Sequence, residues 1–274
     1  MTWRPHSRTS IGVSNLKNLI NLGVDHIDLT INPNVEKKIL LETFKKKGST
    51  AISMHLGIFN IPLIFAKKFK IPLIIWGENS AFEYGYKKKT DISSDLNSSW
   101  LKSYGVTNNT NYQDLISYGL KKKDIFFYTN PKNNYKVKQI FLGNYIKWDP
   151  LKVSIFSKKI GFKRIKKPKT GIYNFSDIDD DFISIHHWLK YYKFGFTRLF
   201  DNLSLEIRNK RITRLEAIKK IKNSSFSPPL NDIKKFCKYV NISVTDFFKI
   251  AEKFRNKDIW FKKNKKWKIR NFIF

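Results

Sequence analysis

Apolar residues in the first part of the chain follow two different spacings. In residues 11–22 and 35–47 they recur every three or four positions, and each segment is followed by a glycine. This spacing predicts two amphipathic helices that end at a C-cap glycine. Residues 26–31 alternate between apolar and polar side chains and predict a strand between these helices. Residues 55–70 predict a third helix, irregular around its internal proline.

A continuous apolar run at residues 73–76 ends at Gly77 and predicts a buried parallel strand that is covered on both faces. The polar residues Glu78, Asn79 and Glu83 follow directly. In open α/β sheets, ligands bind outside the carboxyl end of a strand, so these side chains are candidates for a binding site. Acids and amides after a strand are also typical of a helix cap. From these residues alone, both interpretations stay open.

Strands and helices alternate up to about residue 150, and helices dominate afterwards. Residues 1–3 are similar to the end of a strand, residues 137–146 predict a return to the sheet, and residues 87–112 predict a long loop or lid. The later pattern predicts helices at residues 150–159, 182–192 and 197–209, then from Thr213, from Pro228 and from Ser243, and a hairpin at residues 258–274. We therefore expect an α/β domain with a partial parallel sheet at residues 1–150, and a mainly helical region with a terminal hairpin at residues 151–274.

The formal net charge of +31 suggests an anionic partner such as nucleic acid, a nucleotide-linked substrate or an acidic membrane surface. The excess is mostly lysine spread through every segment, as an AT-rich genome would also produce. A nucleic-acid site normally groups basic side chains on one element with aromatic residues between them. The nearest candidates, residues 158–169 and 262–270, are predicted to be loops or hairpin faces. We expect no specific nucleic-acid interface.

The single cysteine, Cys237, excludes an internal disulfide and a multi-cysteine zinc site, and its apolar helical surroundings predict a core position. The N-terminal residues contain no apolar segment of the kind found in signal peptides. The longest apolar stretch, residues 56–66, is too short to span a bilayer. The sequence therefore predicts a cytoplasmic protein without a membrane span.

Two adjacent histidines, His186 and His187, lie in a predicted helix. Neighbouring helical side chains point about 100° apart, so we do not expect both to ligate one metal ion. One is expected to be packed in the interior, and the other to face a substrate as a hydrogen-bond donor or general base.

Two arginines follow, Arg198 and Arg208. Arginine suits bidentate contacts with phosphate or carboxylate groups. The alternative is salt bridging with Asp201 and Glu206, and the residues alone do not decide between the two.

The remaining candidates have two interpretations each. Three tryptophans predict either core packing or platforms for sugar stacking: Trp148, Trp188 and Trp260. Four acids before a predicted helix suggest either a Mg²⁺ site or favourable charges at a helix N-terminus: Asp177, Asp179, Asp180 and Asp181. We assign no metal ligands among them.

Four stretches carry a family resemblance: WGENSAFEYG at 76–85, FLGNYIKWDP at 141–150, DDDFISIHHWLKYYKFGFTR at 179–198 and KFRNKDIW at 253–260. Together they resemble the N-acetyl sugar amidotransferases, which are PP-loop ATPases of bacterial surface-polysaccharide and flagellin sugar synthesis. The resemblance runs over nearly the whole chain in the same order. It implies a partial PP-loop domain, similar to the adenine nucleotide alpha-hydrolases, followed by the helical region.

The resemblance also implies a reaction. ATP, with Mg²⁺, would adenylate the carbonyl oxygen of an acetamido group on a nucleotide-linked or nonulosonate-type sugar. Ammonia from a partner glutaminase would then displace AMP and leave an acetamidino group. The enzyme would position the reactants and stabilise charge on the α-phosphate.

The resemblance further implies roles for individual residues. On its own, His55 before an apolar helix is more typical of a cap or core histidine; the family pattern makes it a catalytic candidate. The implied catalytic residues are Glu78, Asn79, His55 and His186. The implied cofactor-binding residues are Trp76, Gly77, Glu78, Asn79 and Glu83. The implied substrate-binding residues are Trp148, His187, Arg198 and Arg208.

One family feature is absent from the sequence. Members carry a Ser-Gly-Gly-x-Asp-Ser phosphate loop, and this sequence has no Gly-Gly pair. Backbone N–H groups at such a loop hold pyrophosphate, so we expect the ATP site to need a separately encoded N-terminal half. Two alternatives stay open: a basic nucleic-acid-binding protein, and a non-catalytic remnant that still docks a partner.

Overall fold

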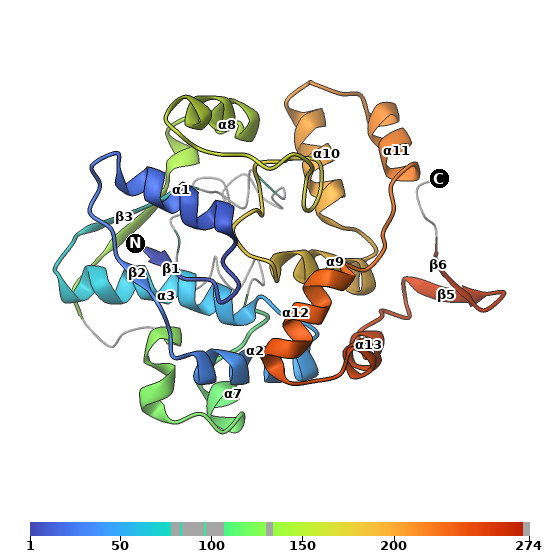
Figure 1. The fold of residues 1–274 in the computed structure, drawn as a ribbon, viewed down its shortest axis with the longest axis horizontal. Helices are drawn as coiled ribbons and strands as arrows, with labels where there is room; N and C mark the ends of the chain where they lie inside the picture. The colour runs from blue at the N-terminus through green and yellow to red at the C-terminus, as the bar shows by residue number, and fades with distance from the viewer. Residues whose placement is uncertain (78–82, 84–95, 97–106, 130–133, 271–274) are drawn as a thin grey trace.

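The computed structural model describes residues 1–77, 83, 96, 107–129 and 134–270 (Figure 1). Its first part contains the elements that the apolar spacing predicts, in the predicted order. They are β1 (Thr2–Trp3), α1 (Ser10–Ile20), β2 (Asp28–Leu29), α2 (Pro33–Lys47), α3 (Ile52–Lys68) and β3 (Leu73–Trp76). The strand expected over residues 26–31 is therefore only two residues long, and α3 begins before His55 rather than after it.

The described strands of this part form two separate parallel pairs. β1 pairs with β2, and β3 pairs with β4 (Lys138–Phe141), with Leu73 opposite Lys138. Parallel pairing confirms the mixed α/β character, but the sheets are small. The prediction that residues 73–76 are covered on both faces is wrong, because Leu73 is 41% and Ile75 is 56% exposed. The face of the strand that carries Trp76 packs against α3: the ring centroids of Trp76 and Phe59 are 5.4 Å apart.

Glycine ends α2 as predicted. Gly48 has a φ of 57°, and its N–H donates to the carbonyl oxygen of Phe44. A Cβ at Gly48 would lie 2.4 Å from the ring of Phe254. Glycine is required here both by the left-handed backbone conformation and by this close approach.

The later elements confirm the predicted run of helices and the terminal hairpin. They are η2 (Leu142–Asn144), α8 (Pro150–Lys159), α9 (Ile183–Phe194), α10 (Arg198–Arg208), α11 (Arg214–Lys222), α12 (Leu230–Val240), α13 (Val244–Lys253), β5 (Trp260–Lys263) and β6 (Lys266–Ile269). The sequence interpretation missed α7 (Tyr112–Ser117) and the 3₁₀ segment η1 (Lys122–Tyr128), although Asn111 and Asp114 form a capping box. Most of the loop predicted for residues 87–112 lies outside the described residues.

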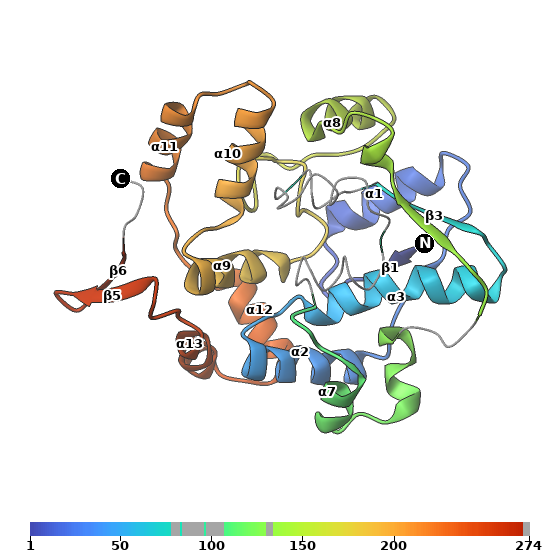
Figure 2. The same cartoon turned by 180° about the vertical axis from the view of Figure 1, so that it is seen from behind.

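Helix α2 lies in two hydrophobic cores. Its residues Leu40 and Phe44 pack with α9, α12 and α13, while Val35 and Ile39 pack with α3, α7 and η1. Figure 2 shows α2 between α3 and the helices that follow residue 180. This packing joins the segment that carries the parallel strands to the helical region.

Cys237 lies in the core between α2, α9, α12 and α13, as its sequence surroundings predict. Burial raises the pKa of its thiol to about 11. The helices of the described part are not suited to crossing a bilayer, since none combines the necessary length and apolar composition.

We predict that Phe247→Ala lowers the free energy of unfolding by about 3–5 kcal/mol. Phe247 is fully buried, and its ring stacks on Phe44 with centroids 4.8 Å apart. Leu215→Ala is the control, since Leu215 is 78% exposed and its loss should change stability by about 0.5 kcal/mol or less. Urea unfolding followed by circular dichroism measures both; a loss below about 1 kcal/mol for Phe247→Ala would contradict the packing described.

Candidate functional site

A row of aromatic and imidazole rings connects the end of β3 with α9. We call Trp76, Phe59, His55, His186 and His187 the ring row. Successive ring centroids are 5.4, 6.4, 5.8 and 5.4 Å apart. Phe59 and His55 lie one turn apart on α3, so one face of this helix links the strand end to the paired histidines. The fold thus brings together four of the residues singled out from sequence.

The two histidines of α9 present buried ring nitrogens. Nδ1 of His186 and Nδ1 of His187 lack a hydrogen-bond partner within the described part of the chain, and Nε2 of His187 has only a long contact of 3.5 Å with Asp177. Burial, together with the nearby His187 and His55, lowers the pKa of His186 well below its ordinary value. His186 is therefore neutral near pH 7 and has a ring nitrogen able to accept a hydrogen bond or a proton.

Asp177 joins the ring row to Arg198. Its two carboxylate oxygens lie 3.5 Å from Nε2 of His187 and 3.5 Å from Nε of Arg198, and the hydroxyl of Thr170 donates to it at 2.6 Å. Burial disfavours its ionised form, but these three neighbours outweigh burial and hold the pKa of Asp177 well below its usual range. Asp177 is thus an ionised carboxylate between two groups that can carry positive charge. The sequence offered no signal that separated it from the three acids that follow.

Arg198 and Arg208 of α10 both contact Glu83. A guanidinium nitrogen of Arg198 binds the Glu83 carboxylate, and Nη2 of Arg208 donates to the Glu83 carbonyl oxygen at 2.8 Å. A residue that the family resemblance places with the cofactor therefore lies against two residues that it places with the substrate.

The salt bridges considered as the alternative for these arginines do not form in the described structure. Asp201 binds Lys190 at 2.6 Å instead, and Glu206 binds Arg211 at 2.6 Å. Helical spacing alone suggested partners on the same helix, whereas Lys190 belongs to α9 and Arg211 follows the end of α10.

The remaining candidates lie apart from the ring row or outside the described residues. Glu78 and Asn79 fall in the latter group, while Gly77 is exposed directly after β3. Trp148 is half-buried and precedes Asp149, the N-cap of α8. The other two tryptophans considered, Trp188 and Trp260, are buried in the core.

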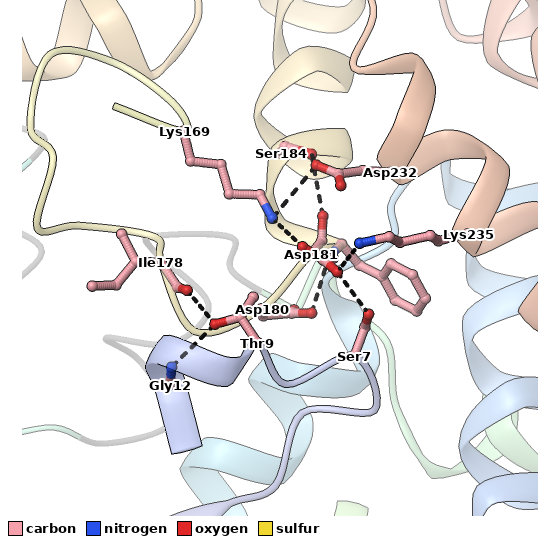
Figure 3. Close-up of polar contacts among 11 residues, drawn as sticks. Ser7, Thr9, Gly12, Lys169, Ile178, Asp180, Asp181, Ser184, Asp232 and Lys235 are labelled. Carbon is pink, nitrogen blue, oxygen red and sulfur yellow. Dashed lines mark hydrogen bonds and ion pairs between the residues drawn. The ribbon is translucent and has the colours of Figure 1, made fainter. Parts of the chain in front are cut away.

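The acidic segment before α9 is held by a polar cluster from three parts of the chain (Figure 3). Asp181 accepts hydrogen bonds from Ser7 at 3.2 Å and from Lys169 at 2.6 Å, and it also binds Lys235 of α12. The hydroxyl of Ser184 donates to Asp232 at 2.6 Å. These bonds fix the segment that carries Asp177 against the start of α1 and against α12.

The same segment packs closely on α1. The hydroxyl of Thr9 donates to the carbonyl oxygen of Ile178 at 2.6 Å (Figure 3). A Cβ at Gly12 would lie 2.9 Å from Cβ of Asp179. Among the residues that the structure describes, no three His, Cys, Asp or Glu side chains are placed to hold a metal ion.

Two buried carboxyl groups lie between α2 and the start of α9. Glu36 is 3% exposed and Asp180 is 8% exposed. Burial and the charge of Asp180 raise the pKa of Glu36 to about 8, and burial raises the pKa of Asp180 to about 7. The backbone N–H of Phe182 donates to Asp180, which favours ionisation of Asp180 but does not offset its burial.

Comparison with known proteins gives one finding. Residues 169–273 match the family model of the "LPS biosynthesis protein WbpG-like, C-terminal domain". The matched region contains α9, α10 and the acidic segment, and therefore His186, His187, Asp177 and Arg198. The match supports a role in lipopolysaccharide or sugar biosynthesis. The search of curated proteins gave no match for this chain.

We predict that the free energy of unfolding falls as the pH rises from about 5 to about 8, by about 2–4 kcal/mol from Glu36 alone. The folded chain keeps the Glu36 proton up to about pH 8, whereas an unfolded glutamate releases it near pH 4.5. The stabilisation is complete below the unfolded pKa and is lost as the pH passes the folded pKa.

Urea unfolding across this pH range measures the effect. Glu36→Gln should flatten the pH dependence, because glutamine has no proton to release. Glu42→Gln, on the same helix and with a 24% exposed side chain, should keep the wild-type slope. Equal slopes for wild type and Glu36→Gln would show that Glu36 is not the buried acid responsible.

Proposed function

We propose that this chain is part of an ATP-dependent amidotransferase that converts the acetamido group of a bacterial surface sugar into an acetamidino group. The observation that carries this proposal is the ring row. It draws together residues from two of the stretches that resemble N-acetyl sugar amidotransferases: Trp76 at the end of β3, and the histidine pair in the region matched by the lipopolysaccharide biosynthesis family. Between them lies His55 on α3, which the family pattern makes a catalytic candidate.

The chemistry proceeds in two balanced steps. The acetamido oxygen attacks the α-phosphorus of ATP, and pyrophosphate leaves. Ammonia then adds to the activated carbon, a proton is lost from nitrogen, and AMP leaves with the former amide oxygen. Activation is necessary because an amide oxygen is a very poor leaving group. In this proposal a partner glutaminase supplies the ammonia.

His186 suits the second step. Its neutral imidazole has an unpartnered Nδ1 within the described structure and can accept the proton that ammonia loses on addition. His55, whose ring centroid is 5.8 Å away, lies on the side toward β3 and Trp76. We assign the transfer of this proton to the histidines of the ring row.

The arginines of α10 suit the binding of an anionic part of the sugar substrate, because guanidinium groups make bidentate contacts with phosphate and carboxylate oxygens. Arg198 is 7% exposed and lies next to Asp177, which is itself beside His187. An anion bound to Arg198 would therefore lie near the ring row. This arrangement would orient the acetamido group toward the histidines.

We propose that the ATP phosphates are bound by a phosphate loop outside these 274 residues, since the sequence contains no Gly-Gly pair. Mg²⁺, when bound, would neutralise charge on the phosphate oxygens. The described residues contain no three-ligand metal group, so we expect the ion to be held through ATP and through residues such as Glu78 and Asn79.

The test combines this chain with the polypeptide encoded immediately upstream. The mixture receives ATP, Mg²⁺, an ammonium salt and a 2-acetamido sugar nucleotide, and AMP formation is measured. We expect AMP formation that depends on both polypeptides and on ammonium. His186→Gln should lower the rate by about 10²–10⁴-fold, because general acid–base catalysis contributes that much.

His26→Gln is the matched control, since His26 precedes β2 and its ring bonds the hydroxyl of Thr2 rather than a residue of the ring row. It should leave the rate unchanged. If neither ammonium nor the sugar changes AMP formation by the complete mixture, the proposed reaction is wrong. If labelled ATP does not bind even with the upstream polypeptide present, the chain is a non-catalytic remnant.

A further inference from the structure

We propose that helix α8 forms a membrane-binding surface, which attaches the chain to a lipid bilayer with anionic headgroups. The outward side of this helix carries apolar side chains, and exposed lysines lie among them. We call these residues the α8 surface: Lys152, Val153, Ile155, Phe156, Lys159 and Ile160. The inference goes beyond the proposed function, because it concerns neither ATP nor the sugar.

The first argument is that α8 buries a polar side and exposes an apolar one. Ser154 is 4% exposed, whereas Val153 and Ile155 are each 50% exposed and Phe156 is 64% exposed. A surface helix of a globular protein normally turns its apolar side chains toward the core. Figures 1 and 2 both show α8 at the edge of the molecule. The apolar side of α8 therefore faces outward, away from the cores of the fold.

The contacts at both ends of α8 fix this orientation. Asp149 caps the start of the helix and binds Arg211 at 2.7 Å. After the helix, Asn15 of α1 accepts a hydrogen bond from the N–H of Lys163 at 2.7 Å and donates to the carbonyl oxygen of Lys163 at 3.0 Å. Since α8 is held at both ends, its outward side belongs to the fold and does not depend on a rotation of the helix.

The second argument is the charge of the segment. Residues 150–176 contain no Asp or Glu. Six exposed lysines in α8 and directly after it form no ion pair within the described part of the chain: Lys152, Lys158, Lys159, Lys163, Lys166 and Lys167. A cluster of four to eight basic residues on or beside a helix with an apolar side is typical of attraction to anionic lipid headgroups. The charge of this segment is therefore complementary to an anionic bilayer.

The mixture of side chains favours a bilayer over a protein or a nucleic acid. Lysine is depleted from the centre of protein interfaces, yet Lys152 and Lys159 lie within about one turn of Phe156 on the same side of α8. Proteins that bind single-stranded nucleic acid stack bases on aromatic rings, and the apolar residues here are aliphatic except for one. In a bilayer, the lysine stems can extend the ammonium groups to the headgroups while the apolar side chains enter the acyl boundary.

Co-sedimentation of the whole chain with vesicles tests the proposal. The vesicles consist of phosphatidylcholine with or without phosphatidylglycerol, which is anionic. Wild type should bind the anionic vesicles at least about 10-fold more tightly than the neutral ones. The double variant Ile155→Ser with Phe156→Ser should bind the anionic vesicles about 10-fold or more weakly than wild type, because it loses apolar surface that enters the bilayer. The double variant Lys152→Gln with Lys159→Gln should lose about 10-fold through charge.

The segment η1 supplies matched controls, because it also carries exposed lysines and an exposed phenylalanine. Lys122→Gln with Lys123→Gln makes the same change in net charge as the lysine variant of α8. Phe126→Ser removes a ring that is 54% exposed. Both controls should bind the anionic vesicles as wild type does.

The proposal is overturned if wild type binds the two kinds of vesicle with equal affinity, or if the η1 variants lose as much affinity as the α8 variants, which would reflect net charge alone. It is also overturned if the Ile155→Ser, Phe156→Ser variant keeps its vesicle binding but no longer associates with the upstream polypeptide, since α8 would then be a protein interface.

The substituted side chains are exposed, so the variants should fold, and circular dichroism checks this. The comparison of the two kinds of vesicle with wild type needs no variant. The vesicle measurements use neither ATP nor the sugar, so failure of the amidotransferase reaction would leave their result intact.

Discussion

The structure of the candidate site depends on the burial of carboxylates in the short segment before α9. Ionised groups taken out of water need partners nearby, and breaking a buried pair commonly costs several kcal/mol. The segment meets this requirement with groups from distant parts of the sequence. Ser7 and the two lysines bind Asp181, while Thr170, His187 and Arg198 surround Asp177.

This requirement positions the candidate site. Because Asp177 lies four residues before Asp181, whatever fixes Asp181 against α1 and α12 also fixes the carboxylate between His187 and Arg198. Helix α3 completes the arrangement from the other side. It carries His55 and Phe59 toward α9 and β3. A Cβ at Gly57 on the same helix would lie 3.1 Å from the ring of Trp3, so glycine allows this close approach.

Sequence predicted those features of the fold that depend on local chemistry. The glycine at position 48 and the capping box at Thr213 and Glu216 mark helix ends correctly, because caps are decided within a few residues. The exposure of Ile75 was not predictable, since an apolar run shows that a strand can be covered but not which elements cover it. The contacts of Glu83 with Arg198 and of Asp177 with His187 join separate segments, so no spacing within one segment reveals them.

The burial of Cys237 has a practical consequence for labelling. Only the thiolate form of cysteine reacts readily, and this thiol is both shielded by the packed helices and protonated at neutral pH because its pKa lies near 11. The native chain, with its single cysteine, should therefore react little with thiol reagents. A cysteine introduced on the surface would then be the one cysteine that a maleimide dye labels. Distances across the molecule can in this way be followed by fluorescence without altering any natural residue of the core.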